Sequence, residues 1–186
     1  MVGQIKDKIL FLRLRKKDKE AFVKAYDLYF DDIYRFVYFK VSSKELAEDI
    51  TSSVFLKSWD YIQNNSLKDF KTLKALFYKI ARNLVIDHYR KTSQQKDVSF
   101  EVDAEAINLA DEKQDVVEQI DLADKINLVQ EKMLELKDEY REVITLRYIN
   151  ELSIAEIALI LDKSQGNVRI LTFRALKALR EITEQG

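Results

Sequence analysis

The side chains best suited to chemistry lie within residues 134–182, where long polar residues follow two helix-start signals. Ser153 and Glu156 form a capping box, in which the serine oxygen accepts from the amide three residues on and the glutamate reaches back. Ser164 is a second N-cap candidate after a short break. The helix that it would open presents an outward face near its start, made up of Gln165, Asn167, Arg169, Ile170, Phe173 and Arg174. Two short helices that meet at a tight turn fit the major groove of DNA, so this segment predicts a DNA-reading helix-turn-helix.

A plain helical hairpin with a solvated basic face would show the same periodicity. The order of features in this segment favours DNA binding over that alternative. A cap, a helix rich in small residues, a short turn, a second cap and a basic helix follow one another along the chain.

A second candidate site combines a long helix predicted over residues 70–91 with an asparagine-rich loop predicted over residues 63–69. Cations on the helix would attract phosphate, and aromatic or planar groups beside them could stack on unpaired bases. Amides in the loop could bind the edge of a base that has left the stack. For any one lysine a solvated surface is the simpler explanation, but the combination favours melted nucleic acid. The candidates are Asn64, Asn65, Lys71, Lys74, Tyr78, Arg82, Asn83, His88 and Arg90. Asp87 is expected to pair with Arg90 or Asn83 instead of contacting a base.

Composition excludes several classes of function. The chain of 186 residues has no cysteine, one histidine, no proline and three glycines. No zinc site, thiol nucleophile or glycine-rich phosphate loop is therefore expected. The one candidate catalytic pair is Asp87 and His88, and adjacent residues on a helix point about 100° apart. We expect no enzymatic activity, no metal and no cofactor.

The sequence also predicts a cytoplasmic protein with no membrane span. No apolar run approaches the roughly 18 residues that a membrane helix needs. The start of the chain lacks the apolar stretch of a signal peptide.

The helices that must position these residues show regular apolar spacing. Nine aromatic residues fall within residues 10–40 at intervals that indicate helices packed on a core. Ser42 and Glu45 form another capping box, which is expected to open a helix running to about Ile62. Helices are expected to resume near Val116.

Charge is unevenly distributed along the chain. The net charge is −1, but residues 96–124 hold ten acidic residues and two lysines, a charge of −8 that leaves +7 for the remainder. Basic ends around an acidic middle are typical of a nucleic-acid-binding protein with a solvated tether. We predict an all-α fold with two helical domains, residues 1–92 and 116–186, joined by a flexible acidic linker over residues 93–115.

Three segments of the chain, in this order, resemble the extracytoplasmic-function (group 4) sigma factors of bacterial RNA polymerase. Residues 47–59 look like the family's segment that binds the polymerase clamp. Residues 80–90, with Ile80-Ala-Arg-Asn83, Asp87 and Arg90, resemble the promoter-melting and minus-10 segment. Residues 140–168 resemble the minus-35-reading domain. The resemblance covers nearly the full length and agrees with the predicted linker.

The resemblance implies a promoter-specificity subunit that binds core RNA polymerase, reads duplex minus-35 DNA and holds the melted minus-10 strand. It implies clamp contacts from Asp49, Ser52, Ser53, Phe55 and Trp59. It also implies an anti-sigma factor as a partner. An autonomous helix-turn-helix regulator, binding duplex DNA without polymerase, remains the alternative.

The chain departs from the family pattern at several positions. Ser52 and Ser53 stand where the family usually has Gln-Glu or Gln-Asp, and Lys137 stands where it usually has proline. Ile170 and Phe173 replace more polar residues and could contact thymine methyl groups or a partner protein.

Overall fold

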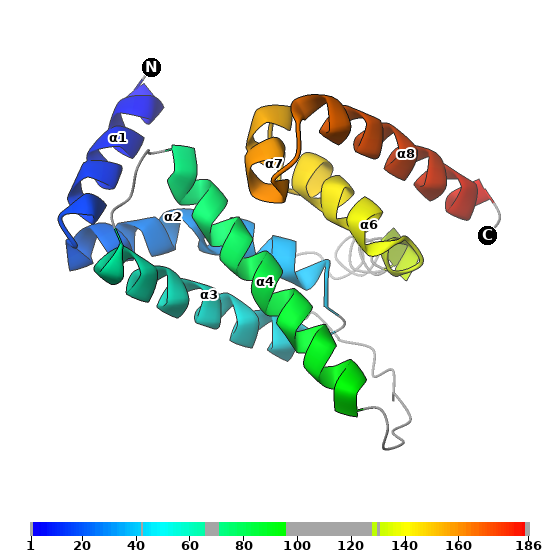
Figure 1. The fold of residues 1–186 in the computed structure, drawn as a ribbon, viewed down its shortest axis with the longest axis horizontal. Coiled ribbons are helices and arrows are strands. Elements are labelled where there is room, and N and C mark those ends of the chain that lie inside the picture. The colour runs from blue at the N-terminus through cyan, green and yellow to red at the C-terminus, as the bar shows by residue number, and fades with distance from the viewer. Residues whose placement is uncertain (1, 42, 66–70, 96–127, 130, 185–186) are drawn as a thin grey trace, which may run out of the picture.

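Every regular element that the computed structural model describes is a helix (Figure 1). The structure describes residues 2–41, 43–65, 71–95, 128–129 and 131–184. The N-terminal group consists of α1 (Val2–Arg15), α2 (Lys19–Tyr38), α3 (Lys44–Asn64) and α4 (Lys71–Gln95). The C-terminal group consists of α6 (Asp138–Ile144), the π-helix η1 (Thr145–Ile149), α7 (Ile154–Leu161) and α8 (Gln165–Glu184). The predicted all-helical fold is confirmed.

The N-terminal helices pack around an aromatic core. Phe36 is fully buried, and Phe55 is 3 % exposed. The ring of Phe55 lies 4.7 Å from that of Tyr26 on α2 and 5.3 Å from that of Phe77 on α4. The aromatic spacing of residues 10–40 therefore reflects core packing, as predicted.

The ends of α3 differ from the prediction. The N-cap is Ser43, whose hydroxyl accepts from the Leu46 amide at 3.2 Å and donates to Glu45. The capping box predicted from Ser42 was wrong by one residue, because Ser43 has the extended backbone that a cap requires. The helix also continues to Asn64, so the first two residues of the predicted loop are helical.

The turn between α7 and α8 was predicted closely. Ser153 and Glu156 form the expected capping box at the start of α7. The helix ends at Asp162, which has a left-handed backbone conformation (φ 52°, ψ 42°). Ser164 then caps α8 by accepting from the Asn167 amide at 3.1 Å. The opposite face of α8 from the predicted outward face is buried and includes Val168, Leu171 and Ala175.

The two groups of helices contact each other directly. The helix α7 packs on α4, and η1 packs on α2 (Figure 1). Of the predicted linker, residues 93–95 belong to α4, and the rest lies outside the described residues, as does the helix start expected near Val116. Within the described ranges, no helix combines the length and apolar character needed to cross a membrane.

Candidate nucleic-acid interface

The first half of α8 presents an exposed face that is suited to duplex DNA. All six residues predicted from the sequence are exposed: Gln165, Asn167, Arg169, Ile170, Phe173 and Arg174. Phe173 is 71 % exposed and Ile170 is 53 % exposed, although both are apolar. Within the described part of the chain, no carboxylate forms an ion pair with Arg169 or Arg174. The guanidinium groups of this face can therefore bind phosphate or the edge of a base.

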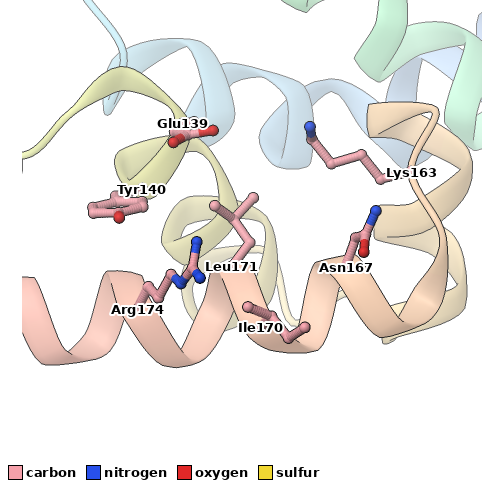
Figure 2. Close-up of a pocket in the computed structure, with 7 residues that line it drawn as sticks. All are labelled: Glu139, Tyr140, Lys163, Asn167, Ile170, Leu171 and Arg174. Atoms are coloured by element: carbon pink, nitrogen blue, oxygen red, sulfur yellow. The ribbon is translucent and has the colours of Figure 1, made fainter.

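A shallow hollow beside this face joins α8 to α6 and to the turn before α8 (Figure 2). Its lining residues are Glu139, Tyr140, Lys163, Asn167, Ile170, Leu171 and Arg174. Lys163 comes from the turn before α8, and Arg174 lies about two and a half turns into α8. Cations therefore stand on both sides of Asn167 and Ile170 (Figure 2). A duplex lying against α8 could contact phosphate through the cations and base edges through the residues between them.

Two cations of the predicted minus-10 site on α4 face the C-terminal helices. The Nζ atom of Lys74 lies 3.8 Å from a carboxylate oxygen of Glu156 and 3.9 Å from one of Asp32. The Nε atom of Arg82 lies 3.1 Å from both carboxylate oxygens of Glu142. Unlike the arginines of α8, these cations are already paired with carboxylates of the chain itself.

Glu156 combines this contact with its role in the capping box. Burial acts to raise the pKa of its carboxyl group, but the hydrogen bonds from the Ser153 hydroxyl and amide and the charge of Lys74 outweigh burial, so the pKa is lowered. The carboxylate therefore stays ionised and available to Lys74.

Tyr78 lies in the core of the molecule, whereas the sequence suggested that it stands on an exposed polar flank. It has no exposed surface, and its ring packs edge-on against Phe36 at 5.3 Å. Burial raises the pKa of Tyr78, and the charges of Asp32 and Glu156 raise it further. Its hydroxyl group has no hydrogen-bond partner in the described part of the chain. In this arrangement Tyr78 cannot stack on a base.

Replacing Tyr78 by phenylalanine is expected to stabilise the protein. A buried hydroxyl group without a partner costs about 1–3 kcal/mol, so its removal should raise the melting temperature by a few degrees. Thermal unfolding followed by circular dichroism measures the change. Tyr61→Phe is the control, since Tyr61 is 43 % exposed and its replacement should have almost no effect. A lower melting temperature for Tyr78→Phe would show that the hydroxyl group is bonded.

The remaining candidates for the minus-10 site are distributed between α4 and the end of α3. Asn83 and Arg90 are exposed on α4, and Arg90 lies 3.5 Å from Asp87, as predicted for that aspartate. His88 is half-buried, with its ring 5.5 Å from that of Tyr89. Lys71 is the first residue of α4.

The two asparagines have a structural role at the end of α3. The side-chain amide of Asn64 donates to the Asp60 carbonyl at 2.9 Å, and that of Asn65 donates to the Tyr61 carbonyl at 3.0 Å. These bonds close the last turn of the helix. The other residues of the predicted loop, 66–69, lie outside the described residues.

The predicted polymerase-binding residues of α3 separate into surface and core. Asp49 and Ser52 are exposed, and Ser53 is half-buried. Phe55 points inward to the aromatic core, so the structure places it away from any surface contact. Trp59 is half-buried, with its ring 4.9 Å from that of Phe22.

Sequence reasoning missed exposed apolar side chains on α3 and on α2. Leu56 is 72 % exposed, and on the neighbouring helix α2 Val23 is 58 % and Tyr26 is 38 % exposed. Leu56 follows Ser52 by four positions and so shares its face of α3. This four-residue spacing is the sequence signal from which the position of Leu56 could have been predicted.

Comparison with known proteins gives matches on both groups of helices. The Sigma-70 region 2 family model matches residues 25–95, and the Sigma-70 region 4 model matches residues 126–179. The chain is 33 % identical over 177 residues to the ECF RNA polymerase sigma factor SigW of Bacillus subtilis, which covers 91 % of this chain and 92 % of SigW. It is 31 % identical over 172 residues to the ECF RNA polymerase sigma factor BldN of Streptomyces coelicolor. That match covers 91 % of this chain but only 63 % of BldN, so the chain spans less than two thirds of the length of that relative.

Two solved structures share the fold. CnrH, in complex with the cytosolic domain of CnrY, superimposes with a TM-score of 0.70 at 17 % identity, covering 96 % of this chain and 97 % of CnrH. The sigma factor RpoE of Bartonella quintana, in complex with the anti-sigma factor NepR, superimposes with a TM-score of 0.66 at 22 % identity, covering 88 % and 96 %.

Proposed function

Because this chain belongs to the ECF RNA polymerase sigma factors, we propose that α8 reads the minus-35 element, α4 holds the melted minus-10 strand and α3 binds core polymerase. A sigma factor is a promoter-specificity subunit and not itself an enzyme. The chain therefore acts with core RNA polymerase on promoter DNA.

The observation that carries the minus-35 assignment is the free, exposed face of α8. A recognition helix enters the major groove with the residues near its N-terminus, and this helix presents Asn167, Arg169 and Ile170 there. Arginine can bind guanine through two hydrogen bonds, and an apolar side chain can contact the methyl group of thymine. The exposure of Ile170 and Phe173 fits contacts of the second kind.

The minus-10 assignment needs no catalytic group. Bases that leave the duplex can be held by stacking and hydrogen bonds that offset the lost pairing, so the chain needs only to bind the open strand more tightly than the duplex. On α4, Lys74 and Arg82 supply charge for the phosphates, and the exposed Asn83 supplies an amide for a base edge.

The polymerase-binding surface that we propose combines predicted and missed residues. It consists of Asp49, Ser52, Ser53, Leu56 and the exposed part of Trp59. A central apolar side chain surrounded by polar ones is the usual composition of a protein-binding hot spot. In this proposal the exposed Leu56, instead of the buried Phe55, is the apolar residue of α3 that contacts polymerase.

We also propose two domains joined by an acidic tether, as predicted for residues 1–92, 93–115 and 116–186, except that the first domain extends to Gln95 because residues 93–95 belong to α4. A tether would allow both DNA-reading helices to engage one promoter at a raised effective concentration. We further propose an anti-sigma factor as a partner, because CnrH and RpoE were solved with CnrY and with an anti-sigma factor. We also propose that the protein acts in the cytoplasm, where it would meet polymerase and promoter DNA.

Run-off transcription tests the proposed function. Purified core RNA polymerase is combined with this protein on a library of promoter fragments, and transcripts are compared with those made without the protein. Specific transcripts that require the protein support the proposal and define both promoter elements. Tight duplex binding without polymerase and without transcripts would indicate an autonomous helix-turn-helix regulator.

Replacing Arg169 by alanine is expected to weaken binding to the minus-35 duplex by about 1–3 kcal/mol, because a two-bonded contact to a base is lost. Binding is measured by fluorescence anisotropy with the promoter found above. Arg180→Ala is the matched control, since Arg180 is exposed on the same helix but lies beyond the reading face. Equal losses for the two variants would mean that Arg169 contributes only general charge.

A further inference from the structure

Several charged side chains form ion pairs across the contact between the two groups of helices. Glu142 on α6 is 4 % exposed, and its carboxylate lies 3.0 Å from the Nζ atom of Lys40 and 3.1 Å from the Nε atom of Arg82. Lys40 itself is 6 % exposed. A buried charge is tolerated only when it is paired, so removing one member of this three-residue cluster would leave a buried charge without its partner and weaken the contact between the two groups.

Other polar contacts surround the cluster. Lys79 on α4 lies 2.6 Å from Asp162 at the end of α7, and Lys74 lies 3.8 Å from Glu156. The side-chain amide of Asn150 donates to the Asp32 carbonyl at 2.7 Å. We call this set of contacts across the two groups the closed arrangement.

The carboxylates of the closed arrangement pair with the same cations that would bind phosphates. Lys74 and Arg82 are the α4 cations that we assign to the melted strand, and Glu156 and Glu142 are bound to them. One cation cannot give its full charge to a carboxylate and to a phosphate at the same time. Strand binding on α4 and contact with the C-terminal helices therefore compete for the same side chains.

The size of a promoter leads to the same conclusion. Elements centred near positions −35 and −10 are about 25 base pairs apart, which is about 85 Å of duplex at 3.4 Å per base pair. In the closed arrangement α7 packs directly on α4, and α8, with 20 residues, is only about 30 Å long. Both elements cannot be reached from α4 and α8 while the two groups remain in contact.

We propose that the closed arrangement is an autoinhibited state, in which Glu142 acts as an internal mimic of a promoter phosphate between Lys40 and Arg82. The inference rests on the proposed function of α4. It assigns Lys40 as an additional phosphate-binding residue, which becomes accessible when the groups separate. Opening exposes the cations of α4 and frees α8 to reach the distant element.

The test uses the full chain with one fluorophore on each group of helices. The sequence has no cysteine, so Lys91→Cys and Thr183→Cys, both at exposed positions, provide the labels. Energy transfer is compared between this labelled protein and the same protein carrying Glu142→Gln. The matched control is Glu135→Gln, because Glu135 is exposed and pairs only with nearby Lys132 among the described residues.

An excess of oligodeoxythymidine should shift the parent protein toward the open state and so change its energy transfer. Glu142→Gln is expected to change the energy transfer in the same direction without the oligonucleotide. It is also expected to tighten binding of fluorescein-labelled oligodeoxythymidine about tenfold, if about one molecule in ten of the parent is open. Glu135→Gln should match the parent in both measurements. Unchanged transfer and unchanged oligonucleotide affinity in folded Glu142→Gln would overturn the proposal.

A second variant covers the case in which Glu142→Gln fails to fold. Lys40→Met removes the charge on the N-terminal side of the cluster and keeps an apolar stem against the ring of Phe36, 5.6 Å from the ammonium group. It should change energy transfer in the same direction as Glu142→Gln. No change in transfer in folded Lys40→Met would overturn the proposal.

Run-off transcription separates this inference from the proposed function. If Glu142→Gln opens the protein but no transcript is made with core polymerase, the proposed role of α4 at the minus-10 element is contradicted. The closed arrangement would still inhibit the binding of single-stranded DNA. Normal transcription with no change in transfer or in oligonucleotide affinity would contradict the autoinhibited state alone.

Discussion

Replacing Phe55 by alanine is expected to destabilise the N-terminal helices by about 3–5 kcal/mol, the usual cost of removing a buried aromatic ring. The ring of Phe55 lies within 6.5 Å of four others, those of Phe22, Tyr26, Phe30 and Phe77. Alanine would leave a cavity where helices α2, α3 and α4 meet. Urea unfolding followed by circular dichroism measures the loss.

The same experiment decides between core and surface roles for Phe55. If the residue contacts polymerase, alanine should weaken polymerase binding with little change in stability. Phe55→Leu is the control, because it keeps most of the apolar volume and should recover much of the stability. A stable Phe55→Ala protein would contradict the buried position.

Replacing the adjacent Leu56 by aspartate should have the opposite pattern. Leu56 is 72 % exposed, so stability should hardly change. If Leu56 is the centre of the polymerase-binding surface, a charge at this position should cost about 2 kcal/mol or more, which lowers the affinity for core polymerase about thirtyfold. The affinity is measured by fluorescence anisotropy of the labelled protein titrated with core enzyme.

Lys57→Asp is a suitable control for Leu56→Asp. Lys57 is the next exposed residue of α3 and lies about 100° around the helix from Leu56. A similar loss of affinity for both variants would indicate a general effect of negative charge on this helix. A normal affinity for Leu56→Asp would remove Leu56 from the proposed surface.

Local sequence signals were sufficient for the turn between α7 and α8 and for the exposed face of α8. The capping box of Ser153, the break at Asp162 and the cap at Ser164 are contacts between residues close in sequence, and periodicity shows which side of α8 is apolar. The start of α3 was misplaced because two adjacent serines could both cap it, and backbone conformation selects Ser43. Phe55 was expected at the polymerase-binding surface, although its spacing from Thr51, Ser58 and Ile62 is that of the buried face of α3.

Contacts between distant parts of the chain could not be predicted in this way. The bond from Lys40 to Glu142 joins residues that are 102 positions apart. Periodicity assigns Tyr78 and Arg82 to a side of their own helix, but it contains no information about which element covers that side. The position of Tyr78 in the core and the pairing of Arg82 were therefore visible only in the structure.

Asp162, the left-handed residue at the end of α7, has a backbone conformation and a side-chain contact that favour different amino acids. Glycine adopts this conformation without the steric cost that a side chain incurs, so Asp162→Gly would lower the conformational cost of the turn. It would also remove the carboxylate that pairs with Lys79 on α4. At this position the conformational preference of the turn and the contact with α4 therefore favour different residues, and the aspartate keeps the contact at the cost of a strained backbone.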